Sequence, residues 1–147
     1  MYKVAICVIV CGILTVTLAV GDDKKDTQPI DINGNWKLIA STVEGKKVPA
    51  DEIEKLKYSL IFKDGKYTEA STAGNESGTY KIDDSKSPAL IDFTITDGPE
   101  KGKTQLGLLK FEGDALTVAY AKPGSTDRPK GFDGTDAWAV TSLKRSK

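Results

Sequence analysis

The sequence contains no histidine, and its two cysteines, Cys7 and Cys11, both lie in an apolar stretch near the N-terminus. Histidine is the commonest metal ligand and the usual general base near neutral pH, and cysteine thiolates supply many other ligands and nucleophiles. Zinc centres, serine–histidine or cysteine–histidine catalysis and ordinary haem ligation therefore lack their usual groups. We expect no metal ion, no cofactor and no catalytic residues, and hence no enzyme activity.

An excess of charge of either sign is also absent, since 21 basic residues balance 21 acidic ones. A nucleic-acid partner requires a concentrated cationic surface, so we expect none. The length of 147 residues fits one domain with a sizeable core, and we expect a monomer.

The longest apolar run covers residues 4–20, follows Lys3 and ends in Ala19-Val20-Gly21. This pattern predicts a signal peptide over 1–21 and export to the periplasm, the cell envelope or the medium. The alternative is an uncleaved N-terminal anchor, because the run is nearly long enough to span a bilayer. That anchor is the only membrane attachment we expect. Cleavage would leave a chain without cysteine or disulfides.

Residues 22–31 are charged and predict a flexible leader, and residues 32–147 form the predicted domain. Alternation of apolar and polar residues predicts strands at 35–43, 57–63, 66–71, 79–82, 89–96, 104–111, 115–120 and 136–144, with one short helix at 50–56. Residues 73–78 read as a turn, and residues 122–135 as a barrel-mouth loop or lid. Closely spaced strands with Gly-rich turns predict an all-β fold, an up-and-down antiparallel barrel of about eight strands.

Gly34, Trp36 and Arg145 are predicted to form the barrel floor. A tryptophan on the first strand would fill the closed end, with Arg145 or Lys144 lying over its ring as a cation–π contact. The alternative is that Trp36 faces a ligand. The direction of Trp138 depends on the pleat, and the sequence leaves it open.

Candidate ligand-binding residues are the aromatics with pocket potential and one loop arginine. Tyrosine is favoured because it combines an apolar body with one hydrogen-bonding tip. Arg128 is either an anion contact at the mouth or an ordinary loop charge. The candidates are Tyr58, Phe62, Tyr80, Phe93, Tyr120 and Arg128, and Tyr67 and Phe111 are further aromatics of this kind.

The segment 97–104 ends in Gly-Lys-Thr and superficially suggests a phosphate-binding loop. Only three residues separate Gly98 from Gly102, and a predicted strand follows where that motif needs a helix. We therefore interpret the segment as a connecting turn. We attribute the carboxylate pairs Asp22/Asp23, Asp83/Asp84 and Glu52/Glu54 to exposed turns and a helix face.

Several short blocks together resemble a lipocalin-like domain family described chiefly from planctomycete bacteria, whose activity is unassigned. The blocks are Gly34-Asn35-Trp36, Glu44-Gly45-Lys46, Ile91-Asp92-Phe93-Thr94, Thr96-Asp97-Gly98-Pro99, Lys101-Gly102-Lys103-Thr104, Tyr120-Ala121-Lys122-Pro123-Gly124, Arg128-Pro129-Lys130 and Leu143-Lys144-Arg145. The resemblance implies an exported or envelope-associated small barrel with a fold like that of lipocalins, which carry small apolar molecules. It brings no catalytic residues, and the lipocalin disulfide is missing.

These observations favour an exported, lipocalin-like binding protein for a small hydrophobic or amphipathic molecule. The alternative is a solid-core barrel that acts as a protein-interaction module in the cell envelope. The volume of the interior discriminates the two, because a core packed to ordinary density leaves no room for a ligand. A pocket that gathers two acids, or a lysine with a tyrosine, would revive an enzymatic interpretation.

Overall fold

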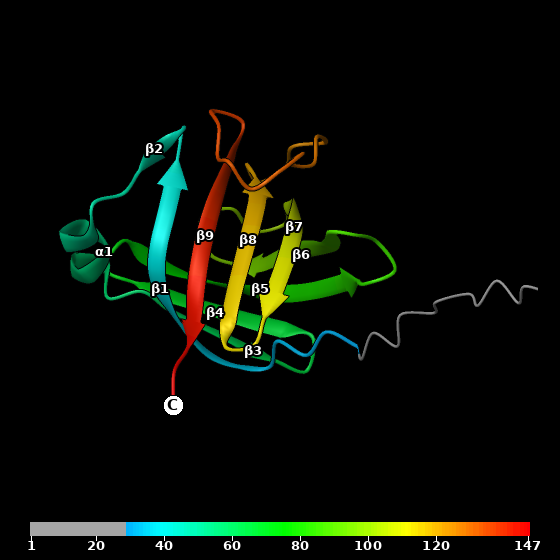
Figure 1. Ribbon diagram of the computed structural model, residues 1–147, viewed down its shortest axis with the longest axis horizontal. Helices are drawn as coiled ribbons and strands as arrows, with labels where there is room; N and C mark the ends of the chain where they lie inside the picture. Colours follow the sequence, from blue (N-terminus) through cyan, green and yellow to red (C-terminus); the bar gives the residue numbers. More distant parts are fainter. Residues whose placement is uncertain (1–28) are drawn as a thin grey trace, which may run out of the picture.

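The computed structural model describes residues 29–147, in which the chain forms nine strands and one short helix (Figure 1). The predicted signal peptide and residues 22–28 of the predicted leader lie outside the described residues. The elements are β1 (Gly34–Val43), β2 (Lys46–Lys47), α1 (Ala50–Leu56), β3 (Ser59–Lys63), β4 (Lys66–Ser71), β5 (Gly74–Asp83), β6 (Ala89–Asp97), β7 (Thr104–Glu112), β8 (Ala115–Ala121) and β9 (Trp138–Arg145).

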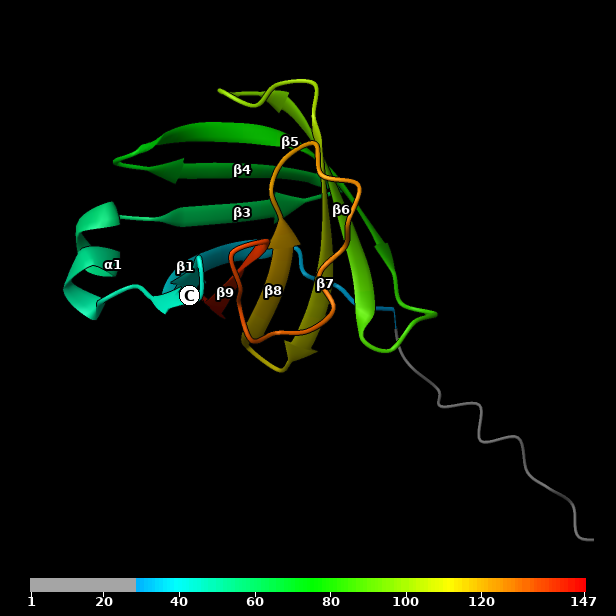
Figure 2. The ribbon, with the colours of Figure 1, turned by 90° about the horizontal axis from the view of Figure 1, so that it is seen from above.

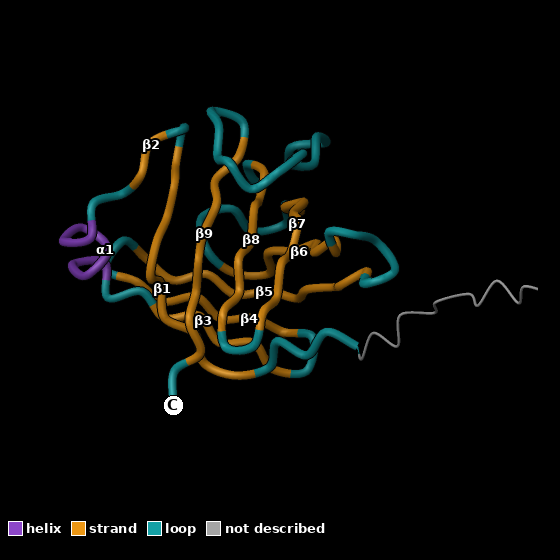
Figure 3. The backbone as a smooth tube through the Cα atoms, viewed as in Figure 1, coloured by secondary structure: helices purple, strands orange, loops and turns teal. Residues whose placement is uncertain are grey.

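Each long strand pairs antiparallel with its neighbours along the chain, and β1 also pairs with β9. This last pairing closes the sheet, so that β1 and β3 to β9 make an eight-stranded up-and-down barrel within the described residues (Figure 3). The two-residue β2 pairs with β1 alone. Figure 2 shows β3, β4 and β5 on one side of the barrel and β7, β8 and β9 on the other. The predicted all-β barrel with one short helix is confirmed.

The prediction of a turn over residues 73–78 was wrong, because β5 begins at Gly74 and runs unbroken to Asp83. Only Thr72 and Ala73 separate β4 from β5. Gly74 has a φ of +142°, a backbone conformation that favours glycine, and it lets the chain reverse within these few residues. The correction places Glu76 inside a strand, directly opposite Glu69.

The long connection between β8 and β9 is attached to the outside of the barrel. Its Phe132 packs against a cluster that contains Leu108, Ala119 and Val140. These residues alternate along β7, β8 and β9 with the residues of the inner core, so they face outward. Trp138 packs on the same cluster and therefore lies on the outer face. The segment was interpreted as a barrel-mouth loop or lid; its middle part packs on the outer wall, and its two ends border Gln105 and Tyr120.

The closed end of the barrel is built around Trp36, whose side chain is fully buried. Its indole nitrogen donates a hydrogen bond to the carbonyl oxygen of Ile32 at 2.8 Å. The Arg145 guanidinium lies over the indole ring, with Cζ 4.5 Å from the ring centroid, and also donates to the carbonyl oxygen of Asn33. A Cβ at Gly34 would lie 2.6 Å from an Arg145 nitrogen, and Gly34 has a φ of +133°, a backbone conformation that favours glycine. Gly34, Trp36 and Arg145 thus form one contact set.

Apolar side chains fill the inner face around this set. The largest fully buried ones in the cluster of Trp36 are Phe62, Ile32, Ile91, Leu109, Leu116 and Leu143. Burying a side chain of this size stabilises the fold by about 1.5–3 kcal/mol. This end of the barrel is therefore a packed core with no room for a ligand.

We predict that Arg145→Met lowers the free energy of unfolding by about 1–3 kcal/mol, because it removes the cation–π contact and the hydrogen bonds to backbone carbonyls. Urea denaturation measures the change. Lys144→Met is the matched control, since Lys144 is exposed on the same strand and pairs with Asp114 only at 3.7 Å. We expect the control to stay within about 0.5 kcal/mol of the unmodified protein. Equal effects of the two substitutions would contradict the assigned role of the guanidinium.

Candidate functional site

A cavity of about 180 Å³ occupies the inside of the barrel toward the end opposite Trp36. Its walls come from every barrel strand except β1, together with the residue before β3. The lining residues are Tyr58, Leu60, Tyr67, Glu69, Glu76, Phe93, Gln105, Val118, Tyr120, Thr141 and Leu143. The apolar members continue the packed core, and the polar members make a second, hydrophilic half of the surface.

The strand pleat explains how two carboxylates reach the interior. Tyr67 and Glu69 are two residues apart on β4 and therefore share its inner face. Glu76 on β5 is the register partner of Glu69. Directly opposed residues in an antiparallel pair have their Cβ atoms about 5 Å apart, so the two acids lie side by side on one wall.

Each carboxylate accepts a hydrogen bond from a tyrosine of the same cavity. The Tyr58 hydroxyl donates to Glu69 Oε2 at 3.0 Å, and the Tyr67 hydroxyl donates to Glu76 Oε1 at 2.8 Å. On the opposite wall, Thr141 Oγ1 donates to the Tyr120 hydroxyl at 3.0 Å. The polar groups are therefore held in place by contacts within the cavity, which is the condition for a preformed site.

The ring of Tyr67 reaches Glu76 because the residue opposite it is glycine. Gly78 is the register partner of Tyr67, and a Cβ at Gly78 would lie 2.8 Å from Tyr67 Cε1 and 2.1 Å from the Thr94 carbonyl oxygen. Tyr67 also packs edge-to-face on Phe93, with ring centroids 5.2 Å apart. A side chain at Gly78 would displace the ring and its hydroxyl.

Burial shifts the ionisation of these groups. Burial raises the pKa of the Glu69 carboxyl, the neighbouring Glu76 charge raises it further, and the Tyr58 hydrogen bond partly opposes the shift. Burial is also the main cause that raises the pKa of Tyr58, Tyr67 and Tyr120. The three tyrosines therefore remain neutral hydroxyls near neutral pH, and they interact with a ligand as hydrogen-bonding and aromatic groups.

Three of the six predicted ligand-binding residues line the cavity: Tyr58, Phe93 and Tyr120. Phe62 lies in the closed-end core, with only 1% of its surface exposed. Its ring packs edge-to-face on that of Tyr80, with centroids 4.9 Å apart. The Tyr80 hydroxyl donates to Asn33 at 3.4 Å, so both of these aromatics serve the floor.

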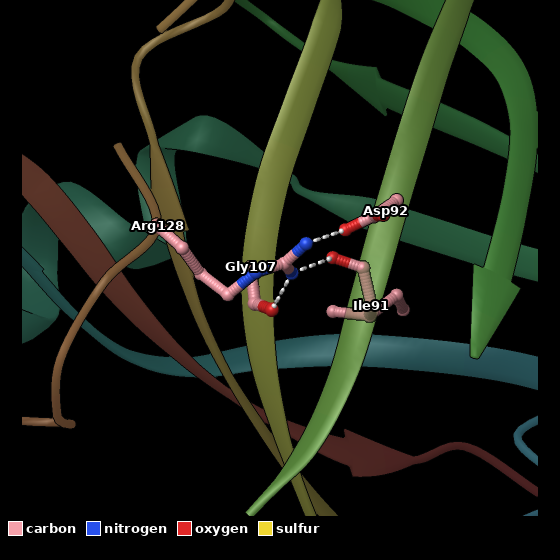
Figure 4. Close-up of polar contacts among 4 residues, drawn as sticks. All are labelled: Ile91, Asp92, Gly107 and Arg128. Carbon is pink, nitrogen blue, oxygen red and sulfur yellow. Dashed lines mark hydrogen bonds and ion pairs between the residues drawn. The ribbon is translucent and has the colours of Figure 1, made fainter. Parts of the chain in front are cut away.

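The sixth candidate, Arg128, is held against the outer wall (Figure 4). Its Nη1 donates to the carbonyl oxygens of Gly107 at 2.6 Å and Ile91 at 3.4 Å. Its Nη2 lies 2.7 Å from Asp92 Oδ1. Asp92 stands between the inward-facing Ile91 and Phe93 and so faces outward. The anion that Arg128 contacts is therefore a carboxylate of its own chain, and the contact fixes the β8–β9 connection to β6 and β7.

Sequence reasoning did not propose Glu69, Glu76, Gln105 or Thr141 for the site. A usable signal existed for Glu69, because it follows Tyr67 at a spacing of two in a strand whose range was predicted correctly. No such signal existed for Glu76, since its segment was interpreted as a turn.

Taken together, a closed eight-stranded up-and-down barrel with an internal cavity near one end is consistent with a calycin-like fold. No protein-family model matches the sequence, and no curated protein matches it either. Within residues 29–147 no helix has the length and apolar character needed to cross a membrane. The same residues contain no group of three or more potential metal ligands.

We predict that stability falls as the pH rises above about 4.5, through the raised pKa of Glu69, because in this window the native state binds more protons than the unfolded chain. The groups facing Glu69 are Tyr58, Tyr67, Glu76 and Tyr120. Urea denaturation between about pH 4 and about pH 8 measures the trend.

In Glu69→Gln this contribution should disappear and the stability profile should flatten. The exposed Glu54 on α1 offers a control, and Glu54→Gln should keep the profile of the unmodified protein. A profile that rises with pH in the unmodified protein and is unchanged in Glu69→Gln would disprove the assignment.

We predict that Arg128→Lys destabilises the protein by about 1–2 kcal/mol, because an ammonium group cannot reproduce the guanidinium contacts to two carbonyl oxygens and a carboxylate. The loss should appear first as faster proteolysis and amide exchange in residues 122–137. Lys130→Arg, a change of an exposed residue in the same segment, is the control. Unchanged protection of the segment in Arg128→Lys would show that the arginine does not hold it.

Proposed function

We propose that this chain is an exported, lipocalin-like binding protein whose barrel holds one small amphipathic molecule, without catalysing a reaction. The observation that carries the proposal is the cavity of about 180 Å³ in an otherwise tightly packed interior. Interiors of ordinary packing density have few voids larger than a water molecule. The cavity therefore supports binding over a barrel with a solid core.

The size of the cavity supports a small ligand. Pockets for drug-sized molecules measure about 300–1,000 Å³, whereas an engineered cavity of about 150 Å³ takes up benzene. The lining supports an amphipathic ligand in particular. Leu60, Phe93, Val118 and Leu143 offer an apolar surface, and the tyrosine hydroxyls and carboxylates of the other half offer polar contacts.

Two acids in one pocket also occur in hydrolytic enzymes, where they stand on either side of the bond that is cleaved. Glu69 and Glu76 are instead neighbours on adjacent strands and belong to the same wall. Each is also hydrogen-bonded to a tyrosine. This arrangement differs from that of a glycoside hydrolase, whose two acids flank the scissile bond, and we take it to support binding.

The second candidate, a protein-interaction module, draws support from the outer wall. Ile39, Val43 and Ile61 on β1 and β3 are 54%, 44% and 41% exposed. These three exposed side chains are spread along the two strands. Isolated exposed apolar residues are common on soluble proteins. They therefore support a protein-interaction module less strongly than the cavity supports ligand binding.

We predict that benzyl alcohol, a small neutral amphipathic probe, binds saturably in the cavity. Backbone amide shifts should concentrate on the lining segments of β4, β5, β7 and β8. Val118→Phe should abolish them, because Val118 lines the cavity and a larger side chain there fills it. Thr117→Phe is the control, since Thr117 is the neighbouring residue on the outer face. Shifts that persist in Val118→Phe, or that lie on the outer wall, would count against binding inside the barrel.

A further inference from the structure

We propose that the molecule held in the cavity carries a positively charged nitrogen, and that Glu69 and Glu76 bind this ammonium group while the aromatic side chains enclose its apolar body. The inference rests on the proposed function and specifies its ligand class. It specifies that the small amphipathic ligand is an organic amine.

The charge of the lining is the first argument. Among the described residues that form the cavity, two are carboxylates and none is lysine or arginine. Glu69 and Glu76 are register partners, and like charges directly opposite one another on a sheet destabilise it. A cation placed between them offsets this repulsion, whereas a fatty acid or another anion would add to it.

The hydrogen bonds of the two acids are the second argument. Tyr58 and Tyr67 each occupy one oxygen, Oε2 of Glu69 and Oε1 of Glu76. The second oxygen of each carboxylate has no partner within residues 29–147. An ammonium group donates up to three hydrogen bonds, so it can use both of these remaining acceptors.

The surroundings of the acids are the third argument. Tyr58, Tyr67, Phe93 and Tyr120 line the same cavity. Aromatic faces attract ammonium cations, and sites that combine such rings with carboxylates are suited to alkylated or aryl-substituted amines. The glutamates also border a surface hollow formed by the tip of the β4–β5 hairpin and by Pro99. They therefore extend toward the open end of the barrel, where a charged headgroup retains contact with water.

A divalent metal ion fits the lining less well than an amine. Calcium takes six to eight oxygen ligands and magnesium requires near-octahedral coordination. Here two carboxylates stand among neutral tyrosines, and the part of the chain that the structure describes brings no third acidic residue, histidine or cysteine to them. Half of the cavity surface is moreover apolar, which accommodates the carbon skeleton of an amine.

The test compares benzylamine, benzyl alcohol and benzoate, which share one aromatic body and differ in charge. Titration calorimetry and amide shifts at low ionic strength and neutral pH measure their affinities for the full chain. We expect benzylamine to bind about tenfold or more tightly than benzyl alcohol, because a hydrogen bond between two charged groups is stronger than one that involves a neutral hydroxyl. Benzoate should bind most weakly of the three.

Two variants test whether the preference for benzylamine depends on Glu69 and Glu76. Glu69→Gln and Glu76→Gln should each lower the benzylamine affinity about tenfold and should narrow the difference between benzylamine and benzyl alcohol, since the glutamine keeps the shape and loses the charge. Glu54→Gln on α1 is the matched control and should bind benzylamine as the unmodified protein does. Amide spectra show whether each variant keeps the barrel fold, and the comparison of the three compounds on the unmodified protein stands independently of the variants.

The outcomes separate the two proposals. Equal affinities for benzylamine and benzyl alcohol, both mapped to the cavity, would overturn the amine inference and leave a neutral ligand site. Displacement of benzylamine by millimolar calcium would overturn it in favour of a metal site. If none of the three compounds shifts the amides that line the cavity, both the inference and the proposed binding function fail.

Discussion

The fold depends on the ladder between the first and the last strand of the barrel. β1 and β9 are separated by the whole domain in sequence, and their pairing removes the two open edges that the sheet would otherwise present. Trp36 and Arg145 are register partners in this ladder, so the cation–π contact is also the cross-strand pair that fixes the alignment of the two strands. A slip by one residue would turn Trp36 out of the core.

The same ladder contains the irregularity that shapes the outer wall. The register between β1 and β9 shifts between Leu38 and Ala40, and Ile39, the residue skipped, is among the most exposed large apolar side chains of the described chain. A bulge adds one residue to one strand and bends it. Ile39 is therefore exposed as a consequence of local geometry at the closure, which weakens its case as part of a docking surface.

The sequence predicted the architecture well because it depends on local alternation and on turn residues. The helix and the strand at 66–71 were predicted at their observed bounds, and the pairing of Trp36 with a late cation was anticipated. Prediction was poorest at Gly74–Gly78, where two glycines and an asparagine are typical of a turn. These glycines serve the sheet in another way, since Gly74 permits a tight reversal and Gly78 makes space for the Tyr67 ring.

The candidate site was predicted only in part because its composition depends on register, which is a property of two strands. Tyr58, Phe93 and Tyr120 were identified as aromatic residues on amphipathic strands, and they line the cavity. The pairing of Glu69 with Glu76 is visible only once β4 and β5 are aligned. The position of Arg128 outside the cavity was not predictable for a similar reason, because a loop charge gives no indication of the backbone carbonyls and the carboxylate that it contacts.

Two opposed glutamates inside a barrel are costly to the empty protein, and this cost connects stability to binding. Burial and the neighbouring charge both disfavour ionised Glu69. Leucine at either position would continue the apolar lining and relieve that penalty, so the acids are not explained by packing. A ligand that binds the native state alone stabilises it in proportion to the logarithm of its concentration over Kd. A cation that pairs with both carboxylates therefore offsets the destabilisation caused by burying two opposed charges. A purely apolar ligand does not.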